Sequence, residues 1–171
     1  DSNQIVNLPA SFGQLDALRF IFMNGNELER IPDEICQFKN LEELQLENNK
    51  LSHVPKNIGQ LSQLNILLLA GNYLNDLPSS ISLLQSLTSL SLSDNNLMEV
   101  PKGIIQLVNL KQLRLNGNAI RQLPRSLGLL NQLQELQVQE NQLTNLPVSI
   151  GLLSQLQSLN ANFNQLSEIP T

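Results

Sequence analysis

Apolar and polar positions recur along this chain with a period of 23 residues, and the period is clearest in Leu41–Gln63. The pattern there is L-x-x-L-x-L-x-x-N-x-L-x-x-V-P-x-x-I-x-x-L-x-x, and Leu64 starts it again. This spacing fits neither a long amphipathic helix nor a simple alternating strand. A fixed period of between about 20 and 50 residues is typical of a solenoid of stacked coils.

The period divides the chain into repeats, whose positions we number from the first leucine of each. No insertion or deletion interrupts the register. The predicted single domain, residues 1–171, comprises a partial repeat 1–17, full repeats 18–40, 41–63, 64–86, 87–109, 110–132 and 133–155, and a partial repeat 156–171. Solenoids normally end in polar capping units. No cysteine-bearing cap is visible, so we expect a segment of a longer protein. The alternative is a natural chain whose partial repeats serve as caps.

Each position of the repeat has a physical role. The first, fourth and sixth positions are apolar, as in Leu64, Leu67 and Leu69. The spacing of two predicts a short strand with the third, fifth and seventh positions on its other face. A full return after each strand makes successive strands parallel. Every proline lies at the fifteenth position, where its fixed φ suits the start of a short helical or 3₁₀ turn.

An asparagine occupies the ninth position of every repeat, where the chain turns inward after the strand. Its amide can donate to and accept from backbone groups of its own coil and of the neighbouring coil. The predicted structural ladder consists of Asn3, Asn26, Asn49, Asn72, Asn95, Asn118, Asn141 and Asn164. Leucine is similar in size but cannot make these bonds, so we expect Asn72→Leu to cost roughly 1–3 kcal/mol.

Through the motif L-x-x-L-x-L-x-x-N-x-L-x-x-L-P-x-x-I-x-x-L, the whole chain resembles the leucine-rich repeat family. The L-P-x-x-I segment and the 23-residue length resemble the subclass of Ras-suppressor-like, LAP-type scaffold, Roco and bacterial leucine-rich repeat proteins. The resemblance implies an α/β solenoid, a horseshoe with a parallel sheet on its concave face and short helical or 3₁₀ turns on its convex face. It also implies a scaffold or signalling module that binds a protein through the concave face, and it transfers no catalytic residue.

Composition narrows the functional classes. Acids exceed bases, giving a net charge of −5, which argues against a general nucleic-acid binder. No apolar run approaches the ~18 residues of a membrane helix, so we expect no membrane insertion. Cys36 is the only cysteine, so no intramolecular disulfide can form. This favours a cytoplasmic chain and leaves a secreted one open.

Residues that carry chemistry are sparse, and we expect no enzyme activity, no cofactor and no metal site. His53 is the only histidine, and a solvent-facing polar side chain is its simpler interpretation. Cys36 lies on the outer turn, and nothing in the pattern aligns it with His53 as a catalytic dyad requires. Glu43 and Glu47 are roughly 13 Å apart along one strand, too far for the carboxylate pair of a hydrolase.

The positions left free by the repeat are the third, fifth and seventh. Most are polar, but two rows of large apolar side chains lie on either side of an acidic row. The predicted partner-binding residues are Phe20, Phe22, Glu43, Gln45, Glu47, Ile66, Leu68 and Ala70, with Ser91 and Arg114 further along the sheet. A clustered apolar patch usually marks an interface. Our hypothesis is a protein segment with apolar groups around a Lys or Arg. The alternatives are contact with another domain, with preceding repeats, or with a second copy in a homodimer.

Bases and glycines are also unevenly placed. Residues 100–134 contain no acid and five bases, which are Lys102, Lys111, Arg114, Arg121 and Arg125. They do not share one repeat position and so do not form one stripe. A solvated surface is the simpler interpretation, and a secondary site for an acidic partner, with Lys111 and Arg114 on the strand side, is the alternative. The eighth position alternates between glycine and Asn48, Asp94 or Glu140, which indicates duplication of a two-repeat unit, or drift.

These observations predict a non-enzymatic protein-interaction module whose protein partner is unknown. Two alternatives stay open. One is a sensor or targeting segment of a multidomain signalling enzyme, and the other is a bacterial surface protein or secreted effector.

Overall fold

The computed structural model describes residues 2–170, so Asp1 and Thr171, which end the two partial repeats, lie outside it. Short strands alternate with short 3₁₀ turns along the described chain. The strands are β1 (Phe20–Phe22), β2 (Glu43–Gln45), β3 (Ile66–Leu68), β4 (Ser89–Ser91), β5 (Gln112–Arg114), β6 (Glu135–Gln137) and β7 (Ser158–Asn160). The turns are η1 (Ala10–Gln14), η2 (Asp33–Gln37), η3 (Ile58–Gln60), η4 (Ser79–Leu83), η5 (Lys102–Gln106), η6 (Leu127–Leu129) and η7 (Val148–Leu152).

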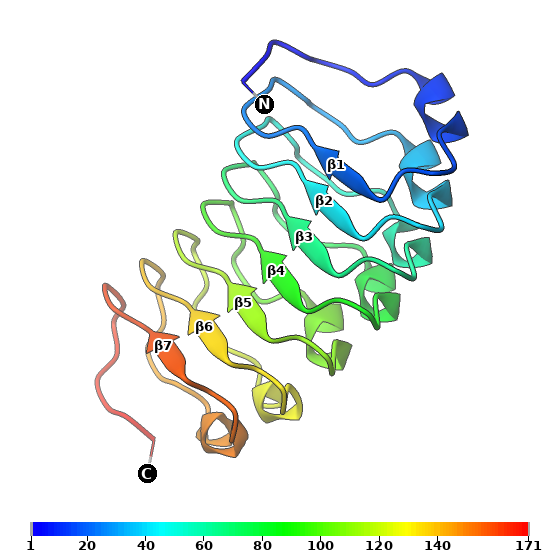
Figure 1. The fold of residues 1–171 in the computed structure, drawn as a ribbon. Coiled ribbons are helices and arrows are strands. Elements are labelled where there is room, and N and C mark those ends of the chain that lie inside the picture. Colours follow the sequence, from blue (N-terminus) through cyan, green and yellow to red (C-terminus); the bar gives the residue numbers. More distant parts are fainter. Residues whose placement is uncertain (1, 171) are drawn as a thin grey trace.

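The strands form one parallel sheet in chain order from β1 to β7. Phe20 pairs with Glu43, and Glu43 pairs with Ile66, so equivalent positions of successive repeats lie side by side. The strands follow the inner side of the solenoid, and the coils spread apart towards the turns on the outer side (Figure 1). The predicted fold, a solenoid with a concave parallel sheet and convex 3₁₀ turns, is confirmed.

Stacked leucines fill the space between the sheet and the turns. Leu64, Leu67 and Leu69, at the first, fourth and sixth positions of one repeat, are completely buried. Burial of each such side chain contributes about 1.5–3 kcal/mol. The core thins in the last described coil, because Leu159 in β7 is 43% exposed whereas Leu136, its partner in β6, is buried.

The prolines lie one step earlier than we expected. Pro32, Pro78 and Pro147 each precede a 3₁₀ turn and have extended ψ values with φ between −63° and −69°. The carbonyl of Pro78 accepts the first turn hydrogen bond, from the amide of Ile81, at 3.0 Å. Proline therefore fixes the direction in which the chain enters the turn, and its lack of an N–H costs nothing there.

The ninth-position asparagines tie neighbouring coils together. The Asn72 amide nitrogen donates to the carbonyls of Leu46, Leu69 and Ala70 at 3.0, 3.0 and 3.3 Å. Its oxygen accepts the Leu51 N–H at 2.9 Å. The same four bonds are made by Asn49, Asn95, Asn118, Asn141 and Asn164. Asn26 keeps the acceptor bond and two donations, and Asn3, in the first coil, is exposed.

The alternation at the eighth position has a packing counterpart. The backbone there has a positive φ at glycine and non-glycine residues alike, as at Gly71 (66°), Asp94 (53°) and Gly117 (66°). A Cβ built on Gly117 would overlap the Asp94 carboxylate of the preceding coil, and one built on Gly71 would overlap the Asn48 amide. Glycine thus lies where the preceding coil places a side chain over it.

Candidate functional site

Two phenylalanines stand on the concave face of β1. Phe20 and Phe22 are 46% and 50% exposed, while Ile21 between them is buried in the core. Their rings stack with centroids 6.4 Å apart and planes 12° apart. The solvent-exposed face of a sheet normally carries polar side chains, so two exposed, stacked aromatic rings are unusual there. Together they offer a flat apolar surface to a partner.

An acidic row lies beside this platform on β2. The Gln45 amide donates to the Glu43 carboxylate at 2.6 Å and accepts from Asn24 at 2.8 Å. The Glu47 carboxylate forms no hydrogen bond with a described residue. Burial raises the pKa of Glu47, and the positive charge of Arg114 opposes that rise. Glu47 is therefore a partly desolvated carboxylate that has no close counter-charge among residues 2–170.

The third row of the predicted site is less exposed than we expected. Ile66 and Leu68 on β3, and Ala70 just after it, are half-buried rather than open to solvent. Ser91, on β4, is 4% exposed. A buried hydroxyl offers little surface to a partner, so Ser91 leaves the candidate site. We use the term β1–β3 patch for the remaining set, Phe20, Phe22, Glu43, Gln45, Glu47, Ile66, Leu68 and Ala70.

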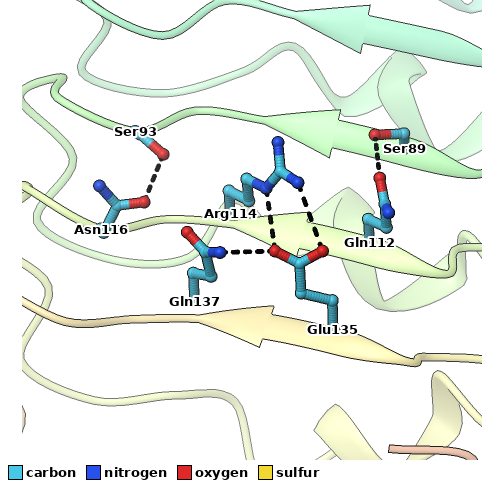
Figure 2. A network of polar contacts seen from close by, with 7 residues as sticks. All are labelled: Ser89, Ser93, Gln112, Arg114, Asn116, Glu135 and Gln137. Atoms are coloured by element: carbon cyan, nitrogen blue, oxygen red, sulfur yellow. Dashed lines mark hydrogen bonds and ion pairs between the residues drawn. The ribbon is translucent and has the colours of Figure 1, made fainter. Parts of the chain in front are cut away.

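The polar groups further along the sheet pair with one another (Figure 2). Arg114 makes a two-pronged ion pair with Glu135 at 3.1 and 3.3 Å, and Gln137 donates to the same carboxylate at 2.5 Å. Two further pairs, Ser89 with Gln112 at 3.1 Å and Ser93 with Asn116 at 2.6 Å, complete the network. Arg114 therefore has a partner within the sheet, and a ligand would have to compete for it.

One neighbour of the β1–β3 patch was missed by the sequence reasoning. The Arg19 guanidinium lies 5.1 Å from the centre of the Phe20 ring and pairs with Glu42 through two bonds of 2.8 and 2.9 Å. Both residues occupy the second position of their repeats. A comparison of second positions in adjacent repeats would have found this pair, because equivalent positions lie side by side.

The residues considered for catalysis are apart from the patch. His53 is exposed, and its Nδ1 lies 3.1 Å from the Ser52 hydroxyl. Cys36 is buried, and burial, with a smaller effect from Asp33, raises the pKa of its thiol to about 11. A thiol of this kind is protonated at neutral pH and a poor nucleophile. Within residues 2–170, no three His, Cys, Asp or Glu side chains gather closely enough to hold a metal ion.

Sequence comparison agrees with this architecture. A family model described as leucine-rich repeat region matches residues 2–99, and a second, described as leucine rich repeat, matches residues 85–143. The chain belongs to the leucine-rich repeat family. No curated protein is similar enough in sequence to count as a match.

Several solved leucine-rich repeat structures are similar to this one. A leucine-rich repeat protein of Leptospira interrogans is 40% identical, with a TM-score of 0.96 over 98% of this chain and 43% of its own. The Arabidopsis receptor kinase HAESA, solved with the peptide hormone IDA and the co-receptor SERK1, is 31% identical, with a TM-score of 0.78 over 93% of this chain and 32% of its own. An internalin of Listeria monocytogenes shares the fold, at 24% identity and a TM-score of 0.85, over 96% and 47% of the two chains. This chain therefore spans less than half of each of these neighbours.

Membership of this family indicates a general function in protein interaction. Leucine-rich repeat domains are in general protein-interaction modules. Neighbours of this chain include a plant receptor ectodomain solved with CASPARIAN STRIP INTEGRITY FACTOR 2, and HAESA, solved with a peptide hormone. The 23-residue subclass stays a prediction. None of the helices among residues 2–170 has the length and apolarity needed to cross a membrane. One neighbour is the ectodomain of a plant membrane receptor kinase, so the comparisons do not support the preference for a cytoplasmic chain.

Proposed function

We propose that this leucine-rich repeat chain is a non-enzymatic module that binds a polypeptide segment on the β1–β3 patch. The segment presents apolar side chains on either side of a Lys or Arg. The observation that carries the proposal is the exposed, stacked pair Phe20 and Phe22 beside two carboxylates.

The chemistry of the patch matches such a segment. Aromatic faces attract an ammonium or guanidinium group, by about 0.5–1 kcal/mol at exposed sites and more when water is excluded. Glu47 would gain a close counter-charge that it lacks within residues 2–170, which offsets its desolvation. Ile66 and Leu68 add apolar surface on the other side of the acidic row. A basic and apolar segment would therefore find complementary groups on each of the three strands.

The polar side chains on the other half of the sheet are paired, which favours the β1–β3 patch as the binding site. From β4 to β6 the polar side chains satisfy one another, as in the pair formed by Arg114 and Glu135. Breaking such pairs costs a ligand part of its binding energy. At the β1–β3 patch a ligand would compete with Arg19 over the Phe20 ring and with the bond between Gln45 and Glu43. The other apolar side chains and the Glu47 carboxylate form no such pairs within residues 2–170, so the cost is smaller there.

A second candidate follows from the structural neighbours. HAESA is a receptor kinase whose solved structure contains a peptide hormone. We propose as the alternative that this chain is the recognition segment of a longer signalling protein. In that case the same patch would serve as the recognition surface.

The experiment selects peptides from a random displayed library on the wild-type chain. Selected peptides are then measured against Phe20→Ser with Phe22→Ser. The matched control is Leu129→Ser with Leu152→Ser, which removes two similarly exposed apolar side chains (58% and 68%) from the convex side. We prefer the phenylalanine pair to a variant of Leu68, because Leu68 is half-buried and its loss would also reduce stability.

We expect enrichment of peptides with apolar residues around Lys or Arg. Their affinity should fall at least about tenfold in the phenylalanine variant, because two central aromatic anchors are lost. Affinity in the convex control should stay near that of the wild type. Equal binding to all three proteins, or selection of acidic peptides only, would refute the proposal for this patch.

A further inference from the structure

A groove lies on the flank of the solenoid between repeats 87–109 and 110–132. Its volume is about 460 Å³, and its floor is formed by the buried side chains of Val100 and Leu123. Met98, which is 71% exposed, stands at the rim. The groove is built from the segments that follow the asparagine ladder, at positions twelve to sixteen, so it is separate from the β1–β3 patch.

Three cations surround this groove. Lys102, Arg121 and Arg125 all line it and are exposed, and Glu99 is the one acid in the lining. None of the three forms an ion pair with a residue of the described chain. By contrast, Arg19, Lys50 and Arg114 are each paired with a glutamate. The three cations outnumber Glu99, so the charge around the groove is net positive and favours an anionic ligand.

We infer that this basic groove, defined by Met98, Val100, Lys102, Arg121, Leu123 and Arg125, binds an acidic segment of a partner protein through carboxylates on either side of an apolar side chain. The two guanidinium groups suit carboxylates because each can donate two parallel hydrogen bonds. The floor of Val100 and Leu123 takes the apolar side chain, and the flexible Met98 can adapt over it.

The lining favours a polypeptide over a nucleic acid. Single-stranded nucleic acids bind where bases stack on aromatic side chains, and the lining contains no aromatic residue. A second groove of about 560 Å³ adjoins it and shares Gln122, Leu123 and Arg125. The two grooves together are long enough for an extended segment that passes Arg125.

The three cations come from two repeat positions, and the fold explains how they meet. Lys102 and Arg125 share the sixteenth position of adjacent repeats, while Arg121 occupies the twelfth position of the same repeat as Arg125. The segment from position twelve to position sixteen runs along the groove, so Arg121 lines it together with Arg125. Of the other two bases in residues 100–134, Arg114 pairs with Glu135 on the sheet, and Lys111 does not line the groove.

The test uses the whole chain and a short, fluorescently labelled peptide in which glutamates flank one leucine. The decisive variant is Arg121→Gln with Arg125→Gln. Its control is Lys39→Gln with Lys111→Gln, which removes the same amount of charge from exposed positions outside the groove. A second peptide carries serine in place of leucine, and an oligothymidylate tests the nucleic-acid alternative. Circular dichroism checks that each variant is folded.

We expect the leucine peptide to bind the wild type and to lose at least about tenfold in affinity with the double-arginine variant, but little with the control. The serine peptide should bind more weakly than the leucine peptide. The inference is overturned if no peptide binding is detected up to about 1 mM, if the two double variants behave alike, or if serine and leucine peptides bind equally. It is also overturned if oligothymidylate binds more tightly through the same arginines. Sedimentation that shows self-association lost only in the arginine variant would assign the groove to a second copy instead.

Discussion

Replacing Asn72 by leucine removes one step of the asparagine ladder from the middle of the solenoid. Asn72 is 4% exposed, so water cannot replace the bonds that the amide makes. Leucine fills nearly the same volume and matches the apolar surroundings. The variant therefore isolates the hydrogen bonds from the packing, and its cost measures what the amide contributes to cohesion between coils.

The expected loss of stability depends on which hydrogen bonds the former partners of Asn72 keep. The Leu51 N–H donated only to Asn72 and would be buried without an acceptor, which costs about 1–3 kcal/mol. The three carbonyls that Asn72 contacted lose one of two bonds and are not orphaned. Their remaining donors are the amide of Asn49 for Leu46, the amide of Asn95 for Leu69, and the backbone N–H of Asn48 for Ala70. We therefore expect about 2–3 kcal/mol in all, the upper part of the range for one stranded group.

Urea unfolding followed by circular dichroism measures this loss. With a slope of about 2–3 kcal/mol per molar urea, the midpoint should fall by about 1 M. Asn26→Leu is the matched control, because Asn26 is also buried but its oxygen accepts, at 3.3 Å, from the N–H of Ile5, a half-buried residue of the first coil that water can reach. Equal losses at the two positions, or none at Asn72, would refute the assignment of the cost to a stranded Leu51 N–H.

Three further predictions concern single side chains. Gly117→Ala should destabilise more in the wild type than in an Asp94→Ala background, where only the left-handed strain of about 1–2 kcal/mol remains; equal urea midpoint shifts in the two backgrounds would show that Asp94 moves aside freely. Burial raises the pKa of the Cys36 thiol from 9.0 to about 11, so the folded state holds this proton more tightly than the unfolded state. Stability due to Cys36 should then be complete below pH 9 and decline between pH 9 and about 11, and Cys36→Ala should flatten that part of the stability profile measured by thermal unfolding. Burial also raises the pKa of Glu47, so its ionised form opposes folding at neutral pH; Glu47→Gln should raise Tm at pH 7, with a smaller gain at acid pH, while it weakens binding of the basic peptides selected on the wild type. A lower Tm for Glu47→Gln would mean that the carboxylate contributes to stability.

The architecture was predictable because it depends on positions that repeat. The leucines at the first, fourth and sixth positions and the ladder asparagines recur in successive coils, so the pattern cannot be a chance resemblance. Because equivalent positions recur at a fixed period, the parallel register of the strands follows from it. The candidate site depends on single positions, whose exposure varies with the particular side chains on the neighbouring strands. Ser91 shows the difference, because its repeat position places it on the concave face, yet between Leu68 and Arg114 of the adjacent strands it is only 4% exposed. Arg114 shows it as well, because its pairing with Glu135 requires a particular pair of side chains rather than a pattern.

Incomplete pairing distinguishes the two proposed sites from the rest of this surface. Most polar side chains on β4–β6 form hydrogen bonds with each other, and the leucines are buried in the core. Neither group would gain contacts from a partner. Glu47 on the concave face and Arg121 with Arg125 on the flank are charges without a close counter-charge in the described chain. The two sites have opposite sign and lie on different sides of the coil, so one partner segment cannot satisfy both in the same way. Added salt should weaken the acidic peptide at the flank groove more than the basic peptide at the β1–β3 patch, because more of the patch is apolar surface, from Phe20, Phe22, Ile66 and Leu68, whose apolar contacts salt does not screen.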